Sequence, residues 1–116
     1  MVLVDTSVWI NHFRNSDSQL IELLKSNQVA CHSLIVGEIA CGSLHNRHKT
    51  IALLKALPML DDANSILEFI EDNKLMSKGV GIVDISLLAS ASLNQTKLWT
   101  VDKRLHAIAV NLNLVS

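Results

Sequence analysis

Residues 2–14 read VLVDTSVWINHFR, a short apolar run followed by an acid and then by a helical pattern. The first three residues of this stretch predict a strand that ends at Asp5. Thr6 or Ser7 can then cap a helix that runs to about Arg14. The stretch therefore predicts a strand that leads directly into a helix, with an acidic side chain where the strand ends.

The remainder of the chain alternates in the same way between short apolar runs and helical patterns. Further strands are expected at Val29–Cys31, Met59–Leu60, Leu98–Val101 and Leu114–Val115. Further helices are expected from a cap at Asp17 or Ser18 to near Asn27, from a cap at Ser33 to about Leu44, over Ile51–Leu57 before Pro58, from a cap at Asp61 or Asp62 towards Lys74, over Ile82–Asn94, and over Lys103–Asn111. Apolar strands that alternate with helices are typical of an α/β fold, in which helices flank a central parallel β-sheet on both faces.

The composition is that of one compact domain spanning residues 1–116. Hydrophobic residues make up 49% of the chain and charged residues 18%, which excludes a disordered chain. Four glycines and one proline favour long helices with few breaks over a turn-rich sandwich. Ten Lys and Arg against eleven Asp and Glu give a net charge of −1, so any contact with nucleic acid must be local.

Targeting and cysteine patterns favour a reducing cytoplasmic setting. No apolar run approaches the roughly 18 residues that a membrane span needs, and the MVLVD start carries an acid instead of basic residues. Cys31 and Cys41 lie in apolar segments and are expected to be buried thiols. A zinc site built on Cys41, His45 and His48 would lack a fourth ligand, so these are expected to be ordinary helix residues.

Four acids stand out by their placement. Asp5 and Asp102 each follow a predicted strand, and the carboxyl ends of parallel strands lie on one edge of a sheet. Glu38 within LIVGEIACG and Asp84 within VGIVDISLLA are lone charges in apolar segments. We therefore expect all four side chains to converge, with Glu38 and Asp84 projecting from apolar helix faces.

The negative charge of such acids must be balanced by a nearby positive charge. A buried, unpaired carboxylate costs several kcal/mol out of a total stability of about 5–15 kcal/mol, and basic residues are scarce near these acids in the sequence. An all-oxygen cluster points to Mg²⁺ or Mn²⁺ rather than to zinc. Carboxylates that hold such an ion with open positions for water and a phosphate oxygen suit phosphodiester hydrolysis.

Each acid also has a purely structural interpretation. Asp5 and Asp102 could cap helices, Glu38 could pair with a distant Lys or Arg, and Asp84 could favour the start of a helix through its dipole. Any one of these explanations is reasonable alone. Four of them would have to coincide with placement at strand ends and in apolar segments, so the pattern favours a functional cluster.

The motifs that carry these acids resemble one known family. They are VLVDTSVWINHFR at 2–14, LIVGEIACG at 34–42, SKGVGIVDISLLASA at 77–91 and LWTVDKRL at 98–105. In this order and spacing they resemble the PIN-domain ribonucleases, and within them the VapC-type toxins of bacterial toxin–antitoxin pairs. The resemblance covers nearly the whole chain.

The resemblance implies a PIN-like three-layer fold and an endoribonuclease that depends on Mg²⁺ or Mn²⁺. It also implies a homodimer that a cognate antitoxin protein holds inactive, with RNA as the substrate. Position by position, the family's acidic metal-site residues correspond to Asp5, Glu38, Asp84 and Asp102. The hydroxyl residues beside that site correspond to Thr6 or Ser7 and to Thr100.

RNA binding would have to use the remaining charge. Setting the four acids aside leaves ten basic against seven acidic side chains. The candidates for contacts with the RNA backbone are Arg14, Arg47, Lys49, Lys78, Lys103 and Arg104.

Three other interpretations remain at this point. A haloacid dehalogenase-type phosphatase also begins with an Asp at a strand end, but it needs a second Asp two residues later, where Ser7 stands. A receiver-like signalling module also clusters acids at strand ends, but the stretch 48–57 lacks its phosphoacceptor Asp. A catalytically inactive PIN binding module would not need the four acids that this chain retains.

Overall fold

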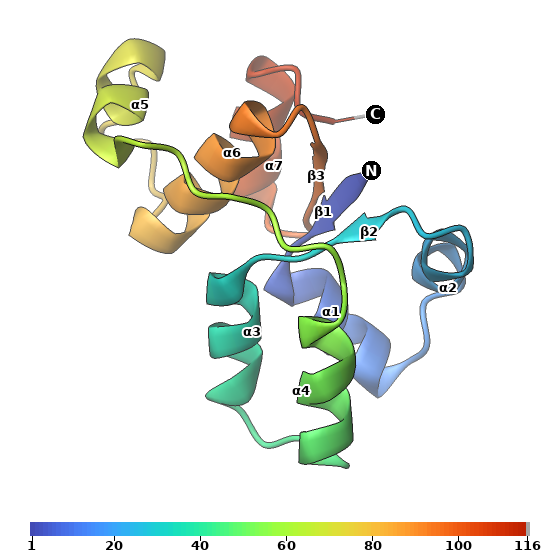
Figure 1. The fold of residues 1–116 in the computed structure, drawn as a ribbon. Coiled ribbons are helices and arrows are strands. Elements are labelled where there is room, and N and C mark those ends of the chain that lie inside the picture. Colours follow the sequence, from blue (N-terminus) through green and yellow to red (C-terminus); the bar gives the residue numbers. More distant parts are fainter. Residues whose placement is uncertain (116) are drawn as a thin grey trace.

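The computed structural model describes residues 1–115 and shows three short strands and seven helices within them (Figure 1). In chain order the elements are β1 (Val2–Val4), α1 (Thr6–Arg14), α2 (Ser18–Lys25), β2 (Val29–Ala30), α3 (Ser33–Ala40), α4 (Arg47–Lys55), α5 (Ile66–Asn73), α6 (Ile82–Leu93), β3 (Lys97–Trp99) and α7 (Lys103–Asn111). No helix of the described chain has the length and apolar character that crossing a membrane requires. The alternation of strands and helices confirms the predicted α/β class.

The sheet is parallel, with β1 between β2 and β3. Val2 is opposite Val29 in β2 and Lys97 in β3. Leu3 and Val4 point to opposite faces of β1, and both are fully buried. Burial of both faces explains why this strand is continuously apolar.

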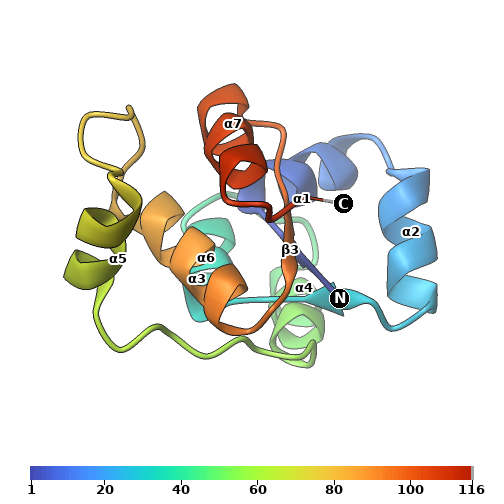
Figure 2. The same cartoon turned by 90° about the horizontal axis from the view of Figure 1, so that it is seen from above.

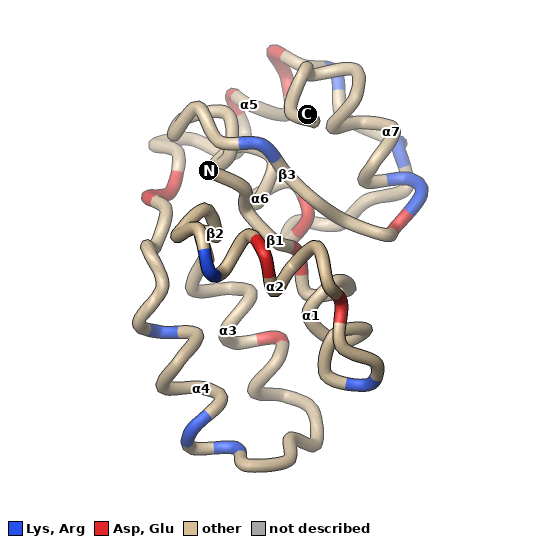
Figure 3. The backbone as a smooth tube through the Cα atoms, turned by 90° about the vertical axis from the view of Figure 1, so that its right-hand side faces the viewer, with Lys and Arg blue, Asp and Glu red and all other residues tan. Residues whose placement is uncertain are grey.

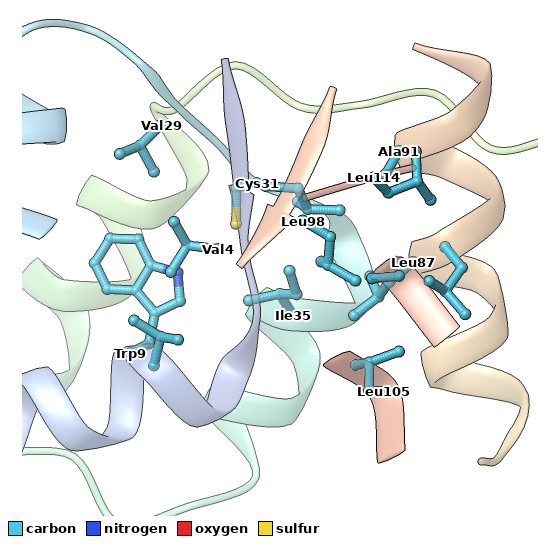
Figure 4. Packing of buried hydrophobic residues seen from close by; sticks show 14 of the residues in the cluster. Val4, Trp9, Val29, Cys31, Ile35, Leu87, Ala91, Leu98, Leu105 and Leu114 are labelled. Carbon is cyan, nitrogen blue, oxygen red and sulfur yellow. The ribbon is translucent and has the colours of Figure 1, made fainter. Parts of the chain in front are cut away.

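Helices cover both faces of the sheet. Figures 1 and 2 show α6 and α7 on one side of the strands and α2 on the other. Figure 4 shows Trp9 packed on one side of the strands and Leu87 on the other, within one cluster of buried hydrophobic residues. The two layers of helices therefore share a core that passes through the sheet.

Several predicted elements are confirmed. Asp17 caps α2, since its side chain accepts a hydrogen bond of 3.0 Å from the backbone N–H of Leu20. Helix α7 has the predicted bounds, and α6 ends one residue earlier than expected.

Met59 forms a single parallel bridge with Cys31 in place of a full strand. The strands expected at 29–31 and 98–101 are shorter or shifted, as β2 and β3, and α4 begins four residues before its expected start.

Two predicted caps are wrong because other side chains take the position. Asp5, not Thr6 or Ser7, precedes α1, and its carboxylate makes no capping bond because hydroxyl groups occupy it. His32, not Ser33, caps α3, since its Nδ1 accepts the N–H of Leu34 at 3.0 Å.

The predicted end of α3 is also wrong. The helix stops at Ala40, four residues before the expected Leu44. The guanidinium of Arg47 donates hydrogen bonds to the backbone oxygens of Ala40, at 2.6 Å, and of Gly42, at 3.1 Å. These bonds satisfy carbonyls that a longer helix would use internally.

The predicted start of α5 at Asp61 or Asp62 is wrong. Ser65 caps the helix by accepting the N–H of Glu68 at 3.1 Å. The two aspartates are engaged elsewhere, because the backbone oxygen of Asp61 accepts the Ser90 hydroxyl at 2.6 Å and the Asp62 carboxylate contacts Nε2 of His32. These bonds fasten the segment between α4 and α5 across the sheet edge.

The strand expected at Leu114–Val115 does not form. The Leu114 oxygen accepts the N–H of Leu98 at 2.7 Å, but the N–H of Leu114 closes the end of α7 on Ala109. That bond removes the donor that a continued ladder would need. Cys31 is buried as expected, whereas Cys41 is exposed because it follows the last residue of α3; neither is in a disulfide.

Replacing Leu3 by Ala tests the role of the central strand. Leu3 is 0% exposed, so the cavity and the lost apolar burial should lower the free energy of unfolding by about 2–5 kcal/mol. Urea denaturation followed by circular dichroism measures the change. Leu67→Ala, at a side chain 68% exposed, should change it by less than about 0.5 kcal/mol. Equal effects of the two variants would contradict this account of the core.

Candidate functional site

Asp5 lies at the carboxyl end of the central strand and is the most buried of the four acids, at 6% exposure. Its Oδ2 accepts hydrogen bonds of 2.8 Å from the hydroxyls of Ser7 and Thr100. Those two hydroxyl oxygens are 3.2 Å apart. The backbone N–H of Asp5 donates to the oxygen of Trp99 in β3 at 2.9 Å. Backbone and side chain together therefore fix this carboxylate between β1 and β3.

Glu38 reaches the same end of the sheet from α3. The hydroxyl of Thr6, next to Asp5, donates to Oε1 of Glu38 at 2.7 Å. Thr6 opens α1 and Glu38 lies in the second turn of α3, so this bond holds the two helices in register at the site. Glu38 is exposed, so the expectation that it projects from a buried apolar face is wrong.

Asp84 lies in the first turn of α6 and is half-buried. Desolvation raises the pKa of its carboxyl above the usual value, and the negative charges of Asp5, Asp102 and Glu38 raise this pKa further. The backbone N–H of Gly81 lowers it in part. The charges of three further carboxylates act on Asp84, so the four acids are close enough to interact electrostatically.

Asp102 precedes α7 and makes two local hydrogen bonds. Its Oδ1 accepts the N–H of Leu105 at 2.9 Å, so the predicted capping role is present. Its own N–H donates to the hydroxyl of Thr100 at 3.1 Å. Asp102 is exposed, because the cap position lies at the rim of the sheet.

The carboxylates keep oxygens available for a ligand. In the described chain, one oxygen each of Asp5, Glu38 and Asp102 receives a side-chain or backbone hydrogen bond, and the other receives none. No Lys, Arg or His within residues 1–115 forms an ion pair with any of the four acids. The cluster is therefore negative, oriented and open.

The donor set fits a hydrated Mg²⁺ better than a closed metal cage. Among residues 1–115, no three His, Cys, Asp or Glu side chains form a ready-made group around one ion. Mg²⁺ retains several waters and takes only one or two carboxylates together with phosphate oxygens. The donors that the four acids offer are all carboxylate oxygens, which are the ligand type that a hydrated Mg²⁺ prefers.

The structure separates the six basic candidates into two regions. Arg14 ends α1, and Arg47 and Lys49 lie on α4. The guanidinium of Arg47 donates a hydrogen bond to the backbone oxygen of Ala40 at the end of α3. Lys78, Lys103 and Arg104 lie beside α7, where Figure 3 shows several blue segments. Lys78 and Arg104 line one hollow that also contains Lys74.

Lys74 is not among the predicted basic candidates, because the sequence predicts only a helix end at this position. A usable signal was present, since two lysines four residues apart, at positions 74 and 78, precede Gly79 in the loop that leads to Asp84. A loop between two helices was expected there, but its conformation is set by three residues with positive φ, at Lys74, Ser77 and Gly79.

Comparisons with known proteins agree with this architecture. The family model described as PIN domain matches residues 2–111. Ribonuclease VapC32 of Mycobacterium tuberculosis, in strain CDC 1551 / Oshkosh and in strain ATCC 25618 / H37Rv, is 41% identical over 111 residues. The match covers 92% of this chain and 89% of either relative.

A solved structure supports the fold independently. The crystal structure of PAE2754 from Pyrobaculum aerophilum superposes with a TM-score of 0.65, covering 92% of this chain and 83% of that one. The two sequences are 16% identical, so this likeness speaks for the fold alone. Together with the family match and the 41% identity, it establishes that the chain belongs to the PIN domain family, in its VapC-type branch.

Proposed function

We propose that this chain is an endoribonuclease that uses Mg²⁺, with Mn²⁺ as a substitute, to hydrolyse RNA phosphodiester bonds. The observation that carries the proposal is the geometry at the carboxyl end of β1. The hydroxyls of Ser7 and Thr100 orient the buried Asp5 carboxylate, and the hydroxyl of Thr6 orients Glu38. No Lys, Arg or His of the described chain forms an ion pair with these acids. A divalent cation supplies the missing positive charge. The relatives named as ribonucleases support RNA as the substrate.

The carboxylates take different parts in this proposal. Asp5, Glu38 and Asp84 hold the ion directly or through water, and Asp102 completes the acidic pocket. Thr6 orients Glu38, while Ser7 and Thr100 orient Asp5 through their hydrogen bonds. These three hydroxyl residues are positioning residues, because their contacts are with the carboxylates.

When bound, Mg²⁺ would lower the pKa of a coordinated water and offset the charge that develops on the phosphate. The oxygen of water forms a bond to phosphorus, and the bond from phosphorus to the 3′-oxygen breaks. The products therefore carry 5′-phosphate and 3′-hydroxyl ends. The ribose 2′-hydroxyl takes no part as a nucleophile.

The proposal includes the partners that the family resemblance implies. A cognate antitoxin with a basic or apolar segment would lie across the acidic groove, in the cytoplasm, and two copies of the chain would pair through apolar helix surface. Exposed apolar side chains on α1 and α4, Phe13 and Leu53, support such a surface.

Membership in the PIN domain family disfavours the receiver-like and dehalogenase-like interpretations. An inactive PIN module remains the competing hypothesis. The oriented carboxylates speak against it, because a binding module gains nothing from holding four acids together without a cation.

Asp84→Asn tests the metal site through stability. Millimolar Mg²⁺ or Mn²⁺ should raise the melting temperature of the unmodified protein, since an ion that binds only the folded state stabilises it by about 2.7 kcal/mol at a hundredfold excess over Kd. The variant should lose most of this shift, and Asp61→Asn, at an exposed acid outside the cluster, should retain it. Thermal denaturation followed by circular dichroism measures both.

The same variant has a defined pH dependence without metal. The folded-state pKa of Asp84 lies above its usual value of 3.8, so ionisation costs more in the folded than in the unfolded state. Stability from this group is complete below 3.8 and is lost as pH rises through the folded pKa. Asp84→Asn should therefore become the more stable protein, relative to wild type, as pH rises through that window. A constant difference at all pH values would contradict this.

RNA cleavage tests the catalytic assignment. Asp5→Asn should lower the cleavage rate by orders of magnitude, whereas Thr100→Ala, which only removes an orienting bond, should lower it about 10–100-fold. His48→Ala should leave the rate largely intact. Rates come from gel analysis of labelled RNA, and end-specific enzymes identify the product ends. Products with 2′,3′-cyclic phosphate, or full activity in excess EDTA, would overturn the mechanism.

Light scattering across micromolar to near-millimolar concentrations tests the pairing of two copies. The molar mass should rise towards twice that of the chain, because burying the exposed apolar helix surface favours association. Leu53→Asp should shift the protein towards the monomer. A mass that stays at one chain throughout would contradict the dimer.

A further inference from the structure

A second site lies beside the acidic cluster. The end of α5, the loop to α6 and the outer face of α7 enclose a hollow of about 380 Å³. We name it the α5–α7 pocket, and the residues of its lining used below are Lys74, Leu75, Lys78, Arg104, Ile108 and Asn111. All charged residues in its lining are cations, and Leu75 and Ile108 provide an apolar floor.

The positions of the cations are fixed by the backbone. Gly79 has φ +80°, and a Cβ at this position would lie 2.9 Å from Nη1 of Arg104. The positive φ favours glycine at this position, and the absence of a Cβ lets the guanidinium lie directly against the loop. Lys74 ends α5 in a left-handed conformation, with φ +54°, which turns the chain so that Lys74 and Lys78 line the same hollow.

Two stretches of the chain connect the pocket with the acidic cluster. Asp102 begins α7, and Arg104, Ile108 and Asn111 follow on one face of that helix. With a rise of 1.5 Å per residue, Asn111 lies about 14 Å beyond Asp102 along the axis. From the other side, Gly79 is two residues before Gly81, which starts the helix that carries Asp84.

The cations of the pocket are available to a ligand. Lys74, Lys78 and Arg104 form no ion pair within the described chain, and none of them is among the groups that shift the pKa of Asp84. They therefore do not neutralise the acidic cluster. A polyanion that presents one phosphate to the metal site could place an adjacent phosphate at these cations.

We propose that the α5–α7 pocket binds one unpaired nucleotide of the RNA next to the scissile phosphate. Its phosphate lies between Lys78 and Arg104, and its ribose or base packs on Leu75 and Ile108. Asn111 provides an amide that can hydrogen-bond to a base edge. The proposal rests on the proposed nuclease function and adds where the substrate strand runs.

The apolar floor and the volume favour a single strand over other anions. Phosphate contacts alone would need only an exposed cationic surface, whereas a splayed base needs a concave apolar wall. A hollow of this size lies within the range of clefts that hold small organic ligands. An acidic protein segment is the competing occupant.

Binding measured without catalysis tests the pocket. The double variant Lys78→Ala, Arg104→Ala is compared with the double variant Lys25→Ala, Lys55→Ala, which removes two exposed charges from α2 and α4. The probes are a short fluorescein-labelled single-stranded RNA of mixed sequence and its duplex, in EDTA, measured by fluorescence anisotropy over a series of salt concentrations.

The pocket variant should bind the single strand about tenfold or more weakly than the control variant. The slope of log affinity against log salt should fall by about 0.7, since the proposal places one phosphate between the two cations and each neutralised phosphate on a single strand contributes about 0.7. Duplex binding should change much less. Equal affinities of the two variants for the single strand would overturn the proposal. An equal loss for single strand and duplex would also overturn it, as would loss of antitoxin binding with RNA binding retained.

A further variant removes no charge. Gly79→Ala should displace the guanidinium of Arg104 and weaken binding of the single strand, while urea denaturation confirms that the variant is folded. Unchanged affinity in a folded Gly79→Ala variant would contradict the assigned position of Arg104.

Cleavage by the unmodified protein in Mg²⁺ is measured in parallel. If it fails while RNA binding still depends on Lys78 and Arg104, the nuclease proposal is wrong and the pocket stands only as an RNA-binding site. If it succeeds while binding does not depend on them, the pocket proposal is wrong and the nuclease stands.

Discussion

The carboxylate of Asp5 accepts hydrogen bonds from Ser7 and Thr100 at the end of the central strand. Ser7 lies in the first turn of α1 and Thr100 follows β3, so a single carboxylate oxygen connects the start of α1 with a residue that lies 95 positions after Asp5 in the sequence. The hydroxyl of Ser7 also accepts the N–H of Val101. Thr6 extends this arrangement to Glu38, and Thr100 accepts the N–H of Asp102, so the positions of these two acids depend on how the end of β1 is held. A buried carboxylate with both donors in place is oriented before any ligand arrives.

Charge separation is the second organising feature. The acids gather at the carboxyl edge of the sheet, while three cations line the adjacent pocket along α7. Direct pairing of the two sets would stabilise the free protein, yet no such pair forms in the described chain. Retaining both sets unpaired is the arrangement expected of a site that binds a cation and a polyanion together, since ligands then supply the missing counter-charges.

Side-chain contacts between elements set where several helices begin and end. Arg47, from the start of α4, terminates α3, and the backbone oxygen of Asp61 is bonded to Ser90 of α6. His32 caps its own helix and contacts Asp62, thirty residues away. These contacts fix α3, and with it Glu38, relative to the sheet. Substitutions at such positions would therefore change the position of Glu38 although the substituted residues make no contact with the acidic cluster.

The sequence by itself determined the α/β class and the central strand, and it indicated four acids whose charges interact in the structure. Apolar periodicity and strand-end placement are local signals, so β1, α2 and α7 could be read from adjacent residues. The tertiary structure alone decided that His32 replaces Ser33 as a cap, that Glu38 and Asp102 are exposed, and that Lys74 joins Lys78 and Arg104 in one pocket. Each of these features depends on contacts between side chains of different elements or on a left-handed turn. The pattern of neighbouring residues in the sequence does not predict such contacts or turns.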